Sequence, residues 1–243
     1  MDMRIAGSGQ IGPGEYENIR ISGSGKLSGF VRCDSFHASG SAKGEELECR
    51  RDMKISGSSK FEKNVSAGSL SVSGSLGVGG SITVEEKISC AGSSKITGSV
   101  RCAELTVSGG ITAGGDVEAE KVKISGKIHC GGLLNAEEIT VKFSTGMEIG
   151  AIGGGKIAIY RDHSSKSVIR LPLLSSLIRD CGGSAVHVKT CIEGDQIALE
   201  GVTAQRVSGR VVAIGADCQI DLVQYSEQLE VSPDAKVGAT EKI

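Results

Sequence analysis

The sequence predicts an all-β fold, a parallel β-helix, and three observations carry the prediction. A Ser-Gly motif or a near relative returns every 17 or 18 residues, at Gly23, Gly40, Gly57, Gly74, Gly92, Gly109 and Gly126. Within each repeat, apolar or small residues recur six positions apart. Around these positions inward and outward residues alternate, which is the period of a strand. A fixed period of this length indicates similar coils stacked so that each contacts only its neighbours.

Each coil is expected to contain three short strands that together trace a triangle. The positions six apart mark these strands in Ile21, Leu27, Cys33; Ile55, Phe61, Ala67; Val72, Val78, Val84; Cys90, Ile96, Cys102; Val107, Ala113, Ala119; and Ile124, Cys130, Ala136. Gly and Ser between them suit tight corners, because Gly adopts unusual backbone angles and Ser bonds to local amides. Strands of six residues also suit a left-handed helix, but the repeats of 17 favour the right-handed, triangular form with 17–18 residues per coil.

Two other interpretations of the repeat are excluded by composition. An α-helical solenoid requires apolar residues at i, i+3 and i+4 and far fewer than the 36 glycines present. A disordered Gly/Ser linker does not hold Ile, Val and Leu at a fixed phase, and it does not reach 39% hydrophobic residues.

The phase of the repeat divides the chain into three parts. Residues 1–145 are predicted to form a β-helix of about seven to eight coils. The phase is lost over residues 146–190, which we expect to be an irregular insertion or linker that interrupts the β-helix. Residues 191–243 are predicted to form further β-helical coils, because apolar residues again recur at a spacing of 17. These residues are Ile197, Ile214 and Val231.

Charge and hydropathy narrow the function. The chain has 27 Lys and Arg against 29 Asp and Glu, so its overall field does not favour nucleic acid or another polyanion. No apolar run approaches the ~20 residues of a membrane span. The first residues, Met1-Asp2-Met3-Arg4-Ile5, lack the apolar region of a signal peptide. We therefore expect a cytoplasmic protein, with membrane association disfavoured and no small-molecule substrate.

The eight cysteines are interpreted as core residues. None forms a Cys-x-x-Cys motif, and their spacings match no zinc site. Three of them share the phase of small core alanines, where a free cysteine acts as a small hydrophobe; these are Cys33, Cys49 and Cys102. Cys33 and Cys49 are expected about one strand spacing apart, ~4.8 Å, which is near disulfide range. In a reducing cytoplasm they should stay thiols.

The remaining motifs give no catalytic, cofactor-binding or metal-binding residue. Gly7-x-Gly9-x-x-Gly12 spells a dinucleotide fingerprint, but Pro13 follows it and no amphipathic helix does. Residues 153–156 lack the Ser or Thr that completes a phosphate-binding loop. All four histidines are expected at the surface; they are His37, His129, His163 and His187. No outward ladder of His, Asp or Lys over a cleft stands out, so we predict that the chain is not an enzyme.

The repeat resembles that of the bactofilin family. The residues that carry the resemblance are 19–24, 53–58, 70–75 and 100–107. Bactofilins are bacterial cytoskeletal proteins with a right-handed β-helix that polymerise without nucleotide, so the resemblance implies this fold and self-assembly. It covers about residues 4–141 well and 195–238 loosely. This chain is longer and interrupted, and the family's N-terminal membrane-targeting tail has no clear counterpart in it.

The ends of the predicted β-helix offer a physical route to assembly. End coils leave backbone N–H and C=O groups without a partner on one side, and coil-like pattern here begins and ends close to the termini. We predict polymer contacts at Met3, Ile5, Val231 and Val237. The expected partner is the chain itself, with a related bactofilin or another scaffold client as a further possibility. We therefore expect the protein to form a cytoskeletal filament that scaffolds cell-shape or motility machinery.

Two alternatives stay open at this point. One is a β-helical enzyme, an acyltransferase or a protein acting on polysaccharide. The other is a heteromeric scaffold in which residues 146–190 bind a partner protein.

Overall fold

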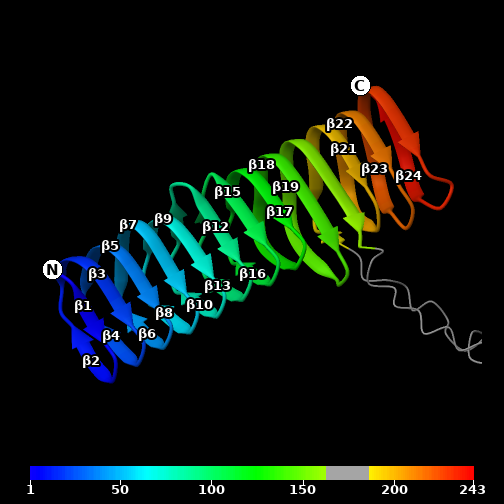
Figure 1. The fold of residues 1–243 in the computed structure, drawn as a ribbon. Coiled ribbons are helices and arrows are strands. Elements are labelled where there is room, and N and C mark those ends of the chain that lie inside the picture. The colour runs from blue at the N-terminus through cyan, green and yellow to red at the C-terminus, as the bar shows by residue number, and fades with distance from the viewer. Residues whose placement is uncertain (163–185) are drawn as a thin grey trace, which may run out of the picture.

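The chain folds into one elongated stack of coils, with the two termini at opposite ends (Figure 1). The computed structural model describes residues 1–162 and 186–243. These residues contain strands and turns, with no helix among them, and every strand pairing between coils is parallel. The predicted parallel β-helix is therefore confirmed; its right-handed sense stays a prediction.

The strands are β1 (Met3–Ile5), β2 (Ser8–Ile11), β3 (Gly14–Ile21), β4 (Ser24–Leu27), β5 (Phe30–Ala38), β6 (Ser41–Gly44), β7 (Glu46–Ile55), β8 (Ser58–Phe61), β9 (Val65–Val72), β10 (Ser75–Val78), β11 (Ile82–Val84), β12 (Lys87–Cys90), β13 (Ser93–Ile96), β14 (Val100–Arg101), β15 (Glu104–Val107), β16 (Gly110–Ala113), β17 (Val117–Ile124), β18 (Lys127–Phe143), β19 (Met147–Arg161), β20 (Val186–Val188), β21 (Cys191–Leu199), β22 (Val202–Ile214), β23 (Gln219–Val231) and β24 (Lys236–Lys242). Several long strands continue around a corner, so that one strand contributes to two faces of the stack.

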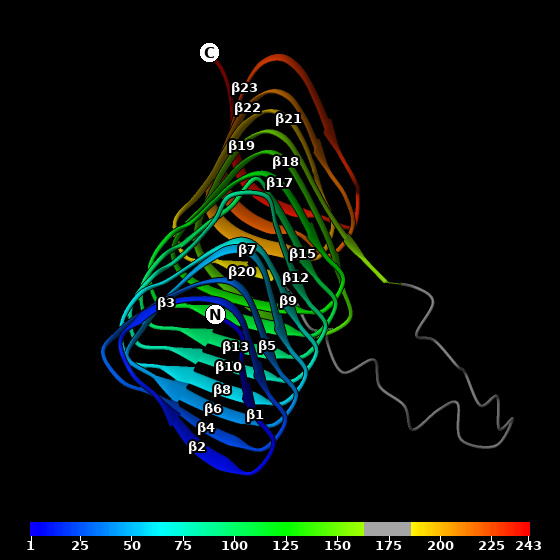
Figure 2. The same cartoon turned by 60° about the vertical axis from the view of Figure 1, so that its left-hand side comes forward.

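One column of core residues follows the stack from end to end. Each member lies in register with the next on the neighbouring coil, and the column is Ile5, Ile21, Ala38, Ile55, Val72, Cys90, Val107, Ile124, Val141, Ile159, Leu199, Ile214 and Val231. Each of the thirteen positions belongs to a different coil, so the described residues form about thirteen coils. Figure 2 shows these coils one behind another with a shared three-sided outline.

The interior of the stack is filled by the residues that the six-residue spacing predicts. All eighteen of those positions are buried except Ala119, which is partly buried against the core. Two aromatic rings of the core, those of Phe36 and Phe61, meet edge to face with their centroids 5.9 Å apart. Small and β-branched side chains therefore supply most of the packing, as the low aromatic content indicates.

A glycine column forms one corner because the backbones there come too close for a side chain. A Cβ added at Gly57 would lie 2.0 Å from the carbonyl oxygen of Gly40 on the preceding coil, and Gly74, Gly92, Gly109 and Gly126 show the same approach of 2.0–2.1 Å. The repeated Ser-Gly motif is thus a steric requirement of stacking. It recurs at the period of the coil because each glycine faces the glycine one coil earlier.

The segment 146–190, expected to be irregular, continues the stack at both of its ends. Strand β19 pairs with β18 before it, and it pairs with β20 and β21 after it. Ile159 and Leu199 are in register although they are 40 residues apart in sequence. Of the residues between them, 23 (163–185) lie outside the described residues. His163 and about half of the proposed partner-binding segment, 146–190, therefore also lie outside the described residues. The described part of this coil therefore has the usual 17 residues.

The register of the later coils differs from the sequence prediction by two residues at one step. Ile197 pairs with Val212, and Leu199 pairs with Ile214, because the coil between these strands has 15 residues. The next coil returns to 17, so Ile214 pairs with Val231 as predicted. A shorter corner shifts the apparent phase of the repeat without breaking the hydrogen-bonded ladder.

The cysteines occupy the core as predicted. Of the seven in the described residues, six are buried and Cys191 is half-buried; all seven are free thiols. Cys33 and Cys49 lie in register on neighbouring coils, directly before Ala67 in the same column. Burial raises the pKa of Cys90, Cys130 and Cys218, and it raises the pKa of Cys102 to about 12.

The buried thiols should be protected from alkylation in the folded protein. Since the thiolate is the reactive form, burial slows the reaction at each buried thiol, and the raised pKa values of Cys90, Cys102, Cys130 and Cys218 slow it further. In a Cys181→Ser variant, which removes the cysteine outside the described residues, we expect iodoacetamide to modify Cys191 alone. All seven thiols should react in guanidinium chloride, as counted by intact mass. Rapid modification of several thiols before unfolding would show that the core is not packed as described.

Candidate functional site

Polar contacts link the N-terminal coil to the residues that follow it. Among the described residues, β1 pairs only with β3 and β2 pairs only with β4, so each strand has one free edge. The hydroxyl of Tyr16 donates to the carbonyl oxygen of Gly12 at 3.0 Å, and the terminal ammonium lies 3.1 Å from Glu17. Of the two predicted contact residues at this end, Met3 is half-buried and Ile5 is only 8% exposed. Ile5 thus already belongs to the core of the monomer.

The C-terminal coil exposes apolar side chains. Strand β24 pairs only with β23, so its other edge has no strand partner among the described residues. Val231 is 44% exposed and Ile243 is 65% exposed. Val237 is half-buried and packs against the core. Val231 continues the core column of the stack, so a further coil placed on this end would bury it.

The four predicted contact residues therefore form two separate surfaces at opposite ends of the stack. Exposed apolar side chains occur at both ends, Met1 at the N-terminal end and Val231 and Ile243 at the C-terminal end, and Val231 is the most exposed core-column residue. An end-on contact would continue the strand ladder at the usual spacing of ~4.8 Å.

The three histidines within residues 1–162 and 186–243 do not form a catalytic arrangement. The Nε2 atom of His37 lies 2.6 Å from Asp52 Oδ2, and the hydroxyl of Ser35 donates to the other oxygen of the same carboxylate at 2.9 Å. The serine thus contacts the carboxylate and not the imidazole that would activate it as a nucleophile. His129 is partly exposed, with its side chain 3.8 Å from Glu148, and His187 is exposed.

The first glycine motif lies in and beside a strand, and the second lies inside one. Gly9 is inside β2, and residues 153–156 are inside β19, so neither precedes a helix that could face a phosphate. Within residues 1–162 and 186–243, no group of three His, Cys, Asp or Glu side chains could hold a metal ion. None of the residues that the structure describes belongs to a helix that could cross a membrane.

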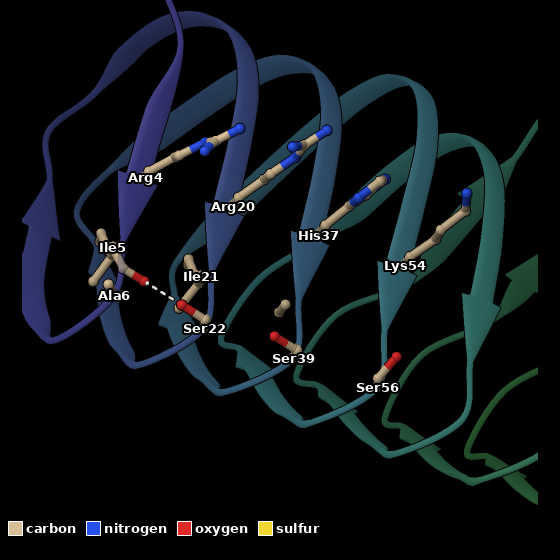
Figure 3. Close-up of a pocket in the computed structure, with 11 residues that line it drawn as sticks. Arg4, Ile5, Ala6, Arg20, Ile21, Ser22, His37, Ser39, Lys54 and Ser56 are labelled. Atoms are coloured by element: carbon tan, nitrogen blue, oxygen red, sulfur yellow. Dashed lines mark hydrogen bonds between the residues drawn. The ribbon is translucent and has the colours of Figure 1, made fainter.

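Sequence reasoning missed one feature, an outward row of cationic side chains. Arg4, Arg20, His37 and Lys54 lie in register on β1, β3, β5 and β7, and Figure 3 shows them projecting to the same side. They border a groove of about 530 Å3 that is also lined by serines of the adjoining corner. The sequence contains this row as residues spaced 16, 17 and 17 apart. A ladder that combines acids with bases does not include it, because all four residues are basic.

Carboxylates elsewhere on the surface are held by neighbouring cations. A hydrogen bond from Arg32 lowers the pKa of Glu15, and one from Lys87 lowers the pKa of Glu104. The hydrogen bond with His37 likewise lowers the pKa of Asp52. Most of these partners lie on neighbouring coils, so ion pairs follow the axis of the stack.

Comparison with known proteins identifies the family of the repeat. Residues 18–117 match the family described as Bactofilin, polymer-forming cytoskeletal. This segment is a bactofilin domain. It runs from within β3 to the first residue of β17, and so it covers most of the regular glycine-cornered coils. All four predicted contact residues lie outside the matched bactofilin segment, in the coils at the two ends.

Two curated relatives come from Bacillus subtilis (strain 168). The uncharacterized protein YhbE is 32% identical over 116 residues, which are 46% of this chain and 44% of that protein. The uncharacterized protein YhbF is 29% identical over 113 residues, which are 46% of this chain and 42% of that protein. The match thus spans less than half the length of either relative. No solved structure matches the chain.

Proposed function

We propose that this chain is a cytoskeletal protein that assembles end to end by stacking its β-helix on other copies, without nucleotide. The bactofilin domain supports a structural, polymer-forming role. The observation that carries the end-on geometry is the C-terminal coil, where Val231, a member of the core column, is 44% exposed beside an unpaired strand edge.

Such a contact can form without nucleotide hydrolysis. Stacking two end coils pairs free backbone groups and buries apolar surface, and burial contributes roughly 25 cal/mol per Å2 before the costs of association. Contacts between like ends close on themselves, whereas contacts that use both ends extend into a filament. Two end surfaces on one chain therefore suffice for a filament.

We propose that this assembly takes place in the cytoplasm. A cytoplasmic location suits a cytoskeletal family and seven free thiols, because thiols persist in a reducing compartment. The partner is a second copy of the chain, and scaffolding of cell-shape or motility machinery is the role we propose for the polymer.

Purified protein tests the proposal directly. In nucleotide-free buffer we expect wild-type protein at high micromolar concentration to pellet on ultracentrifugation and to show filaments by negative-stain microscopy. Addition of ATP or GTP should change neither result. A strictly monomeric protein under these conditions would overturn the proposal.

A further inference from the structure

The cationic row stands out because its charges are only partly neutralised. Arg4, Arg20 and Lys54 are exposed, and successive members of the row are ~4.8 Å apart along the axis. Within the described residues, neither Arg4 nor Arg20 forms an ion pair. His37 and Lys54 share a single carboxylate, Asp52, at 2.6 and 3.7 Å.

Several other charged rows of the same stack combine unlike charges. Arg32 donates to Glu15 on the coil before it and to Glu48 on the coil after it, both at 2.9 Å. Pairs on neighbouring coils repeat this pattern farther along the chain: Lys87 with Glu104, Arg101 with Glu118, and Arg210 with Glu227. Like charges directly opposite each other destabilise a sheet. Repulsion between unpaired cations in this row therefore destabilises the stack, and a bound anion would reduce that repulsion.

Hydroxyl groups line the other side of the groove. Ser22, Ser39 and Ser56 lie on the corner next to the row, are exposed, and follow the axis in parallel with the cations (Figure 3). Guanidinium groups bind phosphate oxygens with two parallel hydrogen bonds, and serine hydroxyls donate further ones. Cations beside hydroxyls are thus a combination suited to phosphate.

The opposite side of the same corner is also cationic. Lys26, Lys43 and Lys60 lie in register on β4, β6 and β8, and all three are exposed. Asp52 lies beside the cationic row, but other carboxylates of the first four coils lie on the remaining face and its corners, where Glu15 and Glu48 bind Arg32 and Glu45 lies 3.3 Å from Lys63. The serine-lined corner is therefore the positive edge of a stack whose overall charge is slightly negative.

We propose that this groove binds a phosphate-bearing ligand that lies along the axis, with Arg4, Arg20 and Lys54 binding its phosphate oxygens. The ligand is short. Beyond Lys54 the row continues with Ser71, Ser89 and Thr106, so its cationic part spans three intervals, or about 14 Å. A chain of a few phosphate groups fits this length, and so do the headgroups of neighbouring phospholipids.

Titration with sodium tripolyphosphate tests the site in the full chain. By isothermal titration calorimetry we expect wild-type protein to bind, and Arg20→Gln to weaken binding at least about tenfold through loss of charge-assisted hydrogen bonds. The matched control is Lys123→Gln, because Lys123 is an exposed cation of the same outward row, next to Thr106. This control should bind as wild type does, and circular dichroism should be the same for all three proteins.

Vesicle flotation separates the two sources of phosphate. Flotation with phosphatidylglycerol vesicles but not with phosphatidylcholine vesicles, lost in Arg20→Gln, assigns the groove to lipid headgroups. Tripolyphosphate binding without flotation assigns it to a soluble ligand. Absence of binding in both assays, or equal effects of Arg20→Gln and Lys123→Gln, overturns the proposal.

Discussion

Replacing Val231 with aspartate should give a protein that folds but no longer assembles. Val231 is 44% exposed at the C-terminal end of the core column, so its partner in an end-on contact is expected to be apolar. Placing a carboxylate there removes an apolar contact and buries a charge without a partner, which costs several kcal/mol. Since 1.4 kcal/mol is tenfold in affinity, the concentration required for assembly should rise at least about 100-fold. Sedimentation across a concentration series measures it.

Leu133→Asp is the matched control for that experiment. Leu133 is an apolar residue of similar exposure, 39%, but it lies on β18 in the body of the stack, away from both end coils. It should assemble like wild type. Ile5→Asp is less informative, because Ile5 is only 8% exposed and its substitution disturbs the folding of the first coil. Equal loss of assembly in the Val231 and Leu133 variants would argue against an end-on contact.

The second large effect is expected at the glycine column. In Gly57→Ala the new methyl group would lie 2.0 Å from the carbonyl oxygen of Gly40 and 2.5 Å from that of Ser39. Both neighbours are backbone atoms of the preceding coil, so relief requires the two coils to move apart. We expect a loss of about 3 kcal/mol in the free energy of unfolding, at the upper end of overpacking effects. Urea denaturation followed by circular dichroism measures it.

Gly77→Ala provides the comparison on the next coil. A Cβ at Gly77 has Lys60 Cγ as its nearest neighbour, at 3.7 Å, which is an ordinary contact. Its free energy of unfolding should stay within about 0.5 kcal/mol of wild type. If both variants unfold at the same urea concentration, the close approach at the corner is not what restricts Gly57.

The period of the core was predictable because burial imposes it. Every coil must place apolar residues at the same three points, so positions such as Ile55, Phe61 and Ala67 reveal the coil length. The continuation through β19 was not predictable in the same way. Its glycines at 153–155 interrupt the alternation, and the register shifts between Cys130 and Leu133, whereas the hydrogen-bonded ladder tolerates both.

The outward surface was harder to predict from the sequence. Nothing in the core pattern restricts which charge a residue such as Arg20 or Arg32 carries, and their spacing alone does not reveal a partner. Arg32 meets Glu15 and Glu48 because those residues flank it on neighbouring coils, whereas Arg20 lies between Arg4 and His37. The register between coils had to be known before the two arginines could be distinguished.

The pairing of Ile159 with Leu199 has a consequence for the order of folding. Elsewhere in the core column, paired residues are 15 to 18 apart in sequence, but at this step they are 40 apart. The entropy lost on closing a loop grows with the logarithm of its length, so this closure costs about 0.8 kcal/mol more than that of a 17-residue coil. Because each coil is stabilised by its neighbours alone, the last three coils depend on this one step, and unfolding should begin on their side of it.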